Sequence, residues 1–152
     1  MIAKVRLFIL LGCLGVLLGS CTQTAEPPVE DQIWSTSLSQ AIKRSANESK
    51  PILIDFGADW CKPCKRMHAE VFVDKAIEKR LREQFVPVLV DATDMTPEIS
   101  KLVRKYRVST LPTVVFLNAK GQFLSDQSLV GFANIQELDA RLSQVIKLTA
   151  QP

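Results

Sequence analysis

Apolar and polar residues follow two kinds of spacing along the chain, one typical of helices and one typical of strands. Between residues 38 and 45 the apolar positions recur at the spacing of one helix face, and Ser37 is placed to cap that helix. The run "PILIDFG" at residues 51–57 is apolar apart from Asp55, which is typical of a strand covered on both faces. The folded part of the chain is therefore predicted to begin with a helix and a buried central strand.

The same two kinds of spacing continue to the end of the chain. The further predicted elements are a helix from residue 61 that breaks near 73–74 and resumes over 75–85, a strand over 86–92, a helix over 97–108, a β-hairpin over 110–132 that turns at 118–121, and a helix over 134–148. Asn134 is placed to cap the last helix. This order predicts an α/β domain in which parallel strands alternate with helices and the hairpin adds an antiparallel edge.

The first twenty residues have the plan of a secretory signal. Lys4 and Arg6 precede an apolar run over residues 7–18, and small residues follow before Cys21. The run is shorter than the roughly 20 residues that a permanent bilayer-spanning helix needs. We therefore expect residues 1–20 to be removed, although an uncleaved membrane anchor is the alternative.

The end of this signal, "LGSC" at residues 18–21, resembles the lipobox of bacterial lipoproteins. That resemblance implies a lipoprotein-type signal peptide, acylation of Cys21, and a lipid anchor on the periplasmic side of a bacterial membrane. Thr22 after the cysteine, in place of Asp, favours the outer membrane. Residues 21–32 then form the lipidated N-terminus and a polar, proline-bearing tether, and residues 33–152 form the domain.

Charge and cysteine usage narrow the possible functions. Of the 152 residues, 19 are basic and 16 acidic, a net charge of +3 that falls to +1 when Lys4 and Arg6 leave with the signal. No Lys/Arg tract favours nucleic acid as a partner. Of the four cysteines, Cys13 leaves with the signal and Cys21 is lipidated, so the domain keeps one close pair. One pair does not make a disulfide-stapled scaffold.

That pair lies in "ADWCKPCKRMH" at residues 58–68, and it has three interpretations: a structural bridge, metal ligands or a redox dithiol. Cys61, Cys64 and His68 are three potential ligands, whereas structural zinc takes four, usually from two such knuckles. His68 is the only histidine and no second pair of this spacing exists. We therefore predict no metal site.

Three features of the sequence carry a family resemblance. They are "DWCKPCK" at a helix start, Asp55 six residues before the first cysteine, and "TLPT" at residues 110–113. Together they resemble the thioredoxin family, whose element order residues 33–148 follow. The resemblance implies the thioredoxin fold, a central mixed β-sheet flanked by helices.

Further motifs resemble one subgroup of this family. It comprises the C-terminal periplasmic thioredoxin-like domain of the membrane thiol:disulfide interchange protein DsbD and related lipoprotein thioredoxins. The motifs are "KPILIDFGADWCKPCK", "VF" at 71–72, "VDATD" at 90–94 and "LVGF" at 129–132.

Helix geometry suggests a different chemical role for each of the two cysteines. Cysteines three apart at a helix start share a face and can bridge with little backbone movement. Cys61 meets the free N–H groups and the positive dipole end, which favour its thiolate, so it is predicted to be the exposed nucleophile and Cys64 the resolving thiol. Lys62 either stabilises that thiolate further or is a solvated surface lysine. Pro63 suits the first helical turn.

The resemblance assigns a role to Asp55. It implies a buried acid/base that takes the proton from Cys64; the alternative is a carboxylate that satisfies nearby backbone groups. The lysine beside this residue in thioredoxin has no counterpart here, where Pro87 stands in about that place. Gly57 replaces an aromatic residue and is expected to open the surface beside Cys61.

The resemblance also assigns the substrate-binding residues. Pro112 corresponds to a cis-proline opposite the dithiol, which turns the backbone of Leu111 to pair with an extended substrate; an ordinary trans proline is the alternative. Trp60 is expected to pack beside the dithiol rather than to bind a cofactor. Trp60, Lys62, Pro63, Leu111 and Pro112 thus form the predicted substrate site.

The sequence as a whole predicts a periplasmic, membrane-tethered thiol:disulfide oxidoreductase that needs no cofactor. We expect it to reduce oxidised cysteines of exported proteins with electrons from a membrane thiol-reductase. Its expected contacts are thus protein disulfides, that donor, and the membrane through its lipid, without nucleic acid. Two alternatives stay open: a dithiol oxidase, and a non-enzymatic binding module whose cysteines are locked as a bridge.

Overall fold

A computed structural model describes residues 33–150 of the protein. The predicted signal peptide, Cys21 and the tether therefore lie outside the described residues. Within residues 33–150, no helix is both long and apolar enough to cross a membrane.

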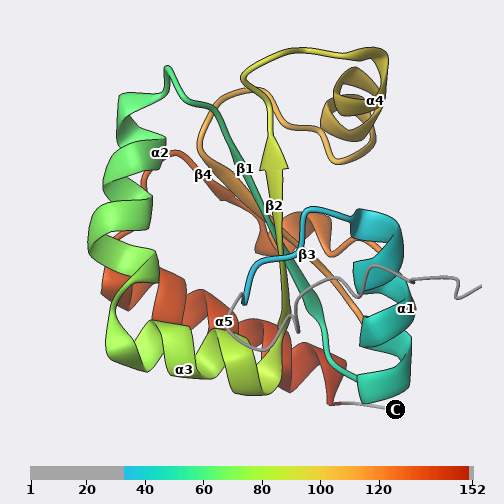
Figure 1. The fold of residues 1–152 in the computed structure, drawn as a ribbon. Coiled ribbons are helices and arrows are strands. Elements are labelled where there is room, and N and C mark those ends of the chain that lie inside the picture. The colour runs from blue at the N-terminus through green and yellow to red at the C-terminus, as the bar shows by residue number, and fades with distance from the viewer. Residues whose placement is uncertain (1–32, 151–152) are drawn as a thin grey trace, which may run out of the picture.

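Helices and strands follow one another in the predicted order (Figure 1). The elements are α1 (Leu38–Glu48), β1 (Ile52–Gly57), α2 (Lys62–Met67), η1 (His68–Phe72), α3 (Lys75–Gln84), β2 (Val86–Asp91), α4 (Pro97–Lys105), β3 (Thr113–Leu117), η2 (Ser125–Gln127), β4 (Leu129–Val130) and α5 (Ile135–Thr149). Of these, η1 is a π-helical continuation of α2 and η2 is a 3-10 turn. The sequence pattern did not reveal either of them.

The four strands form one mixed sheet in the order β2-β1-β3-β4. β1 pairs with β2 in parallel and with β3 antiparallel, and β4 is antiparallel to β3. The predicted central mixed β-sheet flanked by helices is thereby confirmed.

The predicted hairpin turns where expected but returns irregularly. Gly121 donates its N–H to the carbonyl of Asn118 at 2.9 Å, and its φ of +75° is one that glycine adopts freely. After the turn only a single bridge joins Phe123 to Leu117, and η2 separates it from the two-residue β4. The intervening residues 125–128 are all polar, so they lack the apolar positions that a strand packed on a core requires.

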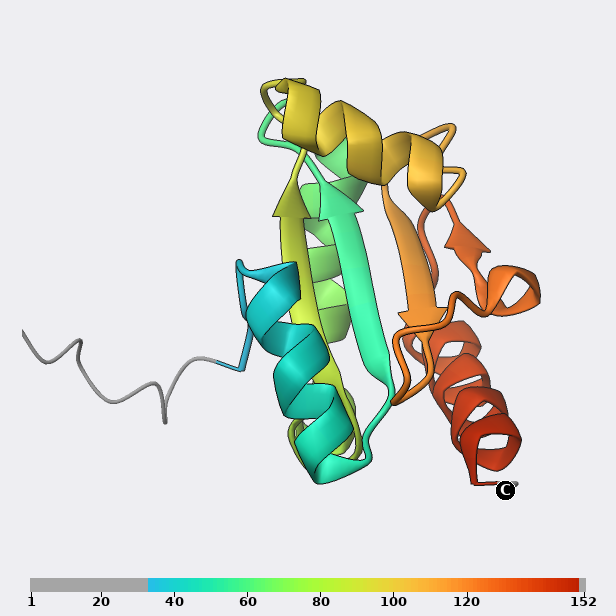
Figure 2. The same cartoon turned by 90° about the vertical axis from the view of Figure 1, so that its right-hand side faces the viewer.

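Successive side chains of a strand point to opposite faces of the sheet, so the strands contribute to two apolar cores, one on each face. Ile52, Ile54 and Phe56 of β1 pack with α1 and α4, whereas Leu53 packs with α2, α3 and α5. Figures 1 and 2 show α1 on one side of the sheet and α3 with α5 on the other, while α4 crosses the end where β1 and β2 finish. Because Asp55 is two residues from Leu53, it faces the side that α2 covers.

Capping side chains set the starts of the helices. Ser37 and Asn134 cap α1 and α5 as predicted, and Asn134 forms a reciprocal capping box with Glu137. The expected break after the cysteine helix is also present. There Asp74 accepts the N–H groups of Ala76 and Ile77 at 2.9 and 3.1 Å and starts α3.

This last cap yields a prediction for stability. Asp74→Ala leaves two N–H groups at the start of α3 without their acceptor and should lower the free energy of unfolding by about 1 kcal/mol. Urea denaturation of the domain measures the change. Asp94→Ala, an exposed aspartate that caps no helix, is the matched control. Equal stability of both variants would contradict the capping role.

Candidate active site

Cys61 is the N-cap of α2, so the sequence places its sulfur at the helix start as predicted. Its Sγ accepts the N–H of Cys64 at 3.2 Å, and its carbonyl accepts the N–H of Lys65 at 3.1 Å. The Sγ atoms of Cys61 and Cys64 form a disulfide, with the Cα atoms 5.3 Å apart. Pro63 lies in the first turn, where no N–H is needed. The pair can therefore bridge on its own helix.

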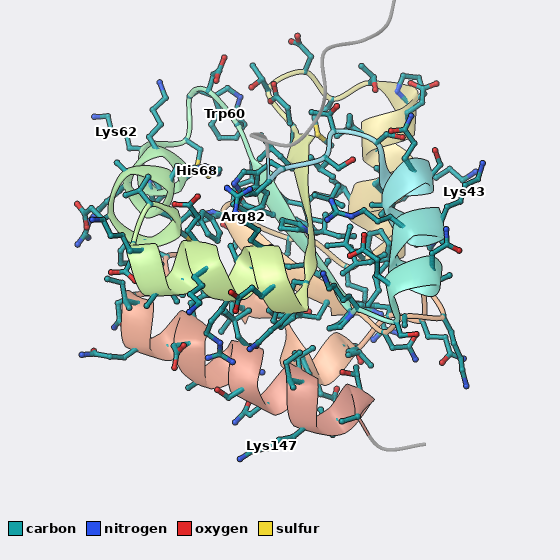
Figure 3. The ribbon with its side chains drawn as sticks, turned by 60° about the horizontal axis from the view of Figure 1, so that its bottom comes forward. Lys43, Trp60, Lys62, His68, Arg82 and Lys147 are labelled. Atoms are coloured by element: carbon teal, nitrogen blue, oxygen red, sulfur yellow. A yellow bond between two sulfur atoms is a disulfide. The ribbon has the colours of Figure 1, made fainter. Side chains whose placement is uncertain are left out.

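Cys61 is less accessible than the sequence suggested. In this disulfide form it is only 4% exposed and Cys64 3%, and both pack against Ala58 and Leu111. The prediction of an exposed Cys61 is wrong for this state, because the bond to Cys64 draws the sulfur towards the helix. Lys62 beside it is exposed, and Figure 3 shows Trp60, Lys62 and His68 at the same end of the molecule.

The peptide bond between Leu111 and Pro112 is cis, which confirms that prediction. Pro112 is buried, and its carbonyl accepts the N–H of Gly131 at 2.8 Å. Leu111 packs against the dithiol cluster. Its own N–H and carbonyl make no hydrogen bond to any residue in the described range 33–150, so both remain available to an added strand.

An apolar groove of about 400 Å³ runs beside this segment. Its lining comprises Trp60, Ala92, Met95, Val103, Val108, Ser109, Thr110 and Leu111. Trp60 is 65% exposed, so it stands at the rim of the groove rather than packing on the dithiol as expected. An exposed aromatic at the rim of an apolar groove is suited to contact a bound polypeptide.

Thr93 holds the loop that carries Trp60. Its carbonyl accepts the indole N–H of Trp60 at 3.3 Å, and its Oγ1 accepts the N–H of Asp59 at 2.8 Å. The N–H of Thr93 in turn donates to the carboxylate of Asp91 at 2.8 Å. Hydrogen bonds from Thr93 hold the pKa of Asp91 below its usual range. In the structure, the "VDATD" segment at residues 90–94 anchors this loop through Thr93.

Asp55 is 1% exposed and lies on the β1 face that α2 covers. Its Oδ2 is 2.7 Å from Nε2 of His68, and among residues 33–150 its Oδ1 has no hydrogen-bond partner. The carboxylate therefore does not satisfy backbone groups, which was the alternative. Its neighbour on β2 is Leu89, because Pro87 pairs with Leu53. Pro87 therefore lies two residues from the direct partner of Asp55 on β2.

Gly57 opens a space beside Cys64, not beside Cys61 as predicted. A Cβ built on Gly57 would lie 3.9 Å from Sγ of Cys64 and 3.9 Å from Oδ2 of Asp55. Strand alternation explains the correction, since Gly57 follows Asp55 by two residues and faces the same side. The space beside Gly57 therefore lies next to both the sulfur of Cys64 and the buried carboxylate of Asp55.

The sequence did not reveal the role of His68 in this site. Its spacing from the cysteines suggested only a metal ligand. In the structure its ring is hydrogen-bonded to Asp55 and packs against Phe72 and Trp34, whose ring centroids lie 5.0 and 5.7 Å away. Within residues 33–150, no three His, Cys, Asp or Glu side chains are grouped as a metal site requires. The available signal was its spacing of four from Cys64, which places both on one helix face.

Comparison with known proteins agrees with this geometry. Residues 38–146 match the thioredoxin-like domain family. Thiol:disulfide interchange protein DsbD of Vibrio cholerae is 31% identical over 127 residues; the match covers 81% of this chain and 21% of the relative. The chain thus spans only about a fifth of the length of such curated relatives.

Two solved structures share the fold. A thioredoxin from Thermus thermophilus superposes with a TM-score of 0.67 at 27% identity, covering 77% of this chain and 88% of that one. The reduced C-terminal domain of Neisseria meningitidis DsbD gives 0.62 at 26% identity, covering 70% and 92%. The chain therefore belongs to the thioredoxin-like family, as a disulfide oxidoreductase with a Cys61–Cys64 disulfide.

Proposed function

We propose that the protein is an exported, membrane-tethered reductant of protein disulfides. The observation that carries the proposal is the position of Cys61 at the N-cap of α2, bonded to Cys64 and facing Leu111. A helix N-terminus favours the thiolate that thiol–disulfide exchange requires. Similarity to thiol:disulfide interchange protein DsbD and its C-terminal domain supports a role in thiol–disulfide exchange.

In the first step the reduced protein forms a mixed disulfide. The thiolate of Cys61 attacks one sulfur of a substrate disulfide, the substrate S–S bond breaks, and the other substrate cysteine leaves as a thiolate. Meanwhile the free N–H and carbonyl of Leu111 pair with the substrate backbone as a short added strand. Trp60 and the apolar groove contact the neighbouring substrate residues.

In the second step Cys64 resolves the mixed disulfide. The Cys64 thiol gives its proton to the carboxylate of Asp55, and the resulting thiolate attacks Sγ of Cys61. The bond between Cys61 and the substrate breaks, and the second substrate cysteine leaves as a thiolate. Two electrons have then passed to the substrate, and the protein holds the disulfide seen in the structure.

The disulfide must then be reduced for another turnover. We propose a membrane thiol-reductase as the electron donor, in keeping with the interchange activity that the name of the DsbD relatives states. Its thiolate attacks Sγ of Cys61, the Cys61–Cys64 bond breaks, and Cys64 leaves and recovers a proton from Asp55. A second thiol of the donor then attacks the donor sulfur bound to Cys61, so that Cys61 leaves as a thiolate and the donor keeps the disulfide. Acylated Cys21 would hold the domain at the membrane, with the outer membrane favoured by Thr22.

Substitution of each cysteine tests the division of roles. Cys64→Ala should accumulate covalent adducts with substrate proteins in cells, because the mixed disulfide on Cys61 has no resolving thiol. Cys61→Ser should form none. Non-reducing electrophoresis followed by mass spectrometry of the trapped partners measures this, with the double variant as control. Adducts that form on Cys64 in Cys61→Ser would reverse the assignment.

Equilibration of the purified domain with glutathione mixtures separates the remaining alternatives. A reductant should reach half-oxidation at a potential near that of thioredoxin, about −270 mV, whereas an oxidase should lie nearer −120 mV. Cysteines that stay bridged at every glutathione ratio would identify a locked binding module and contradict the proposal.

Lipid anchoring has an independent test. Wild-type protein should partition into the detergent phase, and Cys21→Ala should lose that behaviour because it has no acylated residue. Cys13→Ala is the matched control, since that cysteine lies within the expected signal. If Cys21→Ala still partitions with detergent, an uncleaved anchor holds the protein instead.

A further inference from the structure

The buried carboxylate of Asp55 is hydrogen-bonded to a side chain that is partly exposed to solvent. Asp55 is 1% exposed, and its only hydrogen bond to the described part of the chain goes to His68. The His68 side chain is 36% exposed. The 2.7 Å contact between Nε2 and Oδ2 therefore joins an enclosed proton acceptor to a group that meets water.

A half-open pocket of about 230 Å³ brings His68, Cys64 and Gly57 to one surface. The charged groups that face it are Asp59 from the loop after β1, Lys65 from α2 and Asp91 from β2. Leu89 supplies the apolar wall next to Asp55. β2 contains no lysine or arginine, and among residues 33–150 His68 is the one side chain that is hydrogen-bonded to the Asp55 carboxylate.

We propose that His68 is a positioning residue that carries the proton between Asp55 and solvent in each half of the redox cycle. The inference rests on the proposed function, in which Asp55 takes the proton of Cys64. Histidine suits this task because its two ring nitrogens can accept and release a proton at once, and because it ordinarily changes charge between about pH 5 and 8.

The proton balance closes without a ring flip. When Cys64 attacks, its proton moves to the Asp55 carboxyl group while the proton of the Oδ2–Nε2 hydrogen bond moves onto Nε2 of His68, and Nδ1 gives its proton to water. When the disulfide is reduced again, Nε2 returns a proton through Asp55 to the leaving Cys64 sulfur, and Nδ1 takes one from water. Each half-cycle thus leaves the tautomer that the other half-cycle needs.

Packing holds the ring where this transfer requires it. Phe72 and Trp34 contact the His68 ring from η1 and from the segment before α1. His68 is the first residue of the π-helical segment η1, and such segments occur frequently at functional sites. The ring therefore keeps Nε2 on Asp55.

His68→Gln is the decisive variant, because the amide can still hydrogen-bond to Asp55 but cannot relay a proton. In rapid-mixing experiments with a peptide disulfide, attack by Cys61 should keep the wild-type rate. Resolution by Cys64 should slow about a hundredfold, the lower end of what proton-transfer catalysis contributes. Mixed disulfide should accumulate. Glu70→Gln, an exposed change on the same segment, is the matched control.

Two further readouts separate a relay from a merely structural role. In His68→Ala, added imidazole should restore the resolution rate, and circular dichroism should confirm that the variant is folded. In an Asp55→Asn background, His68→Gln should have no additional effect on resolution, because the relay has lost its partner.

The outcomes distinguish this inference from the proposed function. Wild-type protein that reduces no disulfide would contradict both the proposed function and the proton relay. Active wild-type protein with unchanged resolution in His68→Gln would overturn the relay alone. Slow resolution that imidazole does not restore, and that persists in the Asp55→Asn background, would also overturn it and show that His68 acts only through packing.

Discussion

A carboxylate enclosed in an apolar layer is the constraint on which the rest of this site depends. Asp55 occupies a position of β1 where alternation demands an inward side chain, and an unpaired charge there is costly. Its one hydrogen bond within the described residues goes to His68, 13 residues later in the sequence. The loop after β1 and the first turns of the following helix therefore have to return over β1, and this return also sets Cys64 beside Gly57.

The end of the sheet brings three loops together around this centre. The loop after β1 carries the dithiol, and the loop before β3 presents the unbonded N–H and carbonyl of Leu111. The loop after β2 holds Trp60 through Thr93. The chemistry and the recognition are thus separate in space. In the proposed mechanism, proton exchange takes place at the pocket lined by Cys64 and His68, whereas the substrate contacts the groove between Trp60 and α4.

Local patterns predicted much of this arrangement. The spacing of apolar residues predicted the order of the elements, and the motif around the cysteines predicted their helix-start position. The cis-proline was predicted from "TLPT" through the family resemblance. What the sequence missed depends on register between distant elements. The pairing of Leu89 with Asp55, the side to which Gly57 opens and the contact of His68 with Asp55 follow from strand pairing and helix placement. No local periodicity encodes these relations.

The central claim is that Asp55 shares a proton with Cys64, and it can be observed directly at the carboxyl group. Carbon-13 NMR of protein with labelled aspartate, compared with Asp55→Asn to assign the signal, follows Asp55 through a pH titration. We predict different titration curves for the dithiol and disulfide forms, because only a free Cys64 thiol competes for the same proton. Superimposable curves in the two forms would contradict the account.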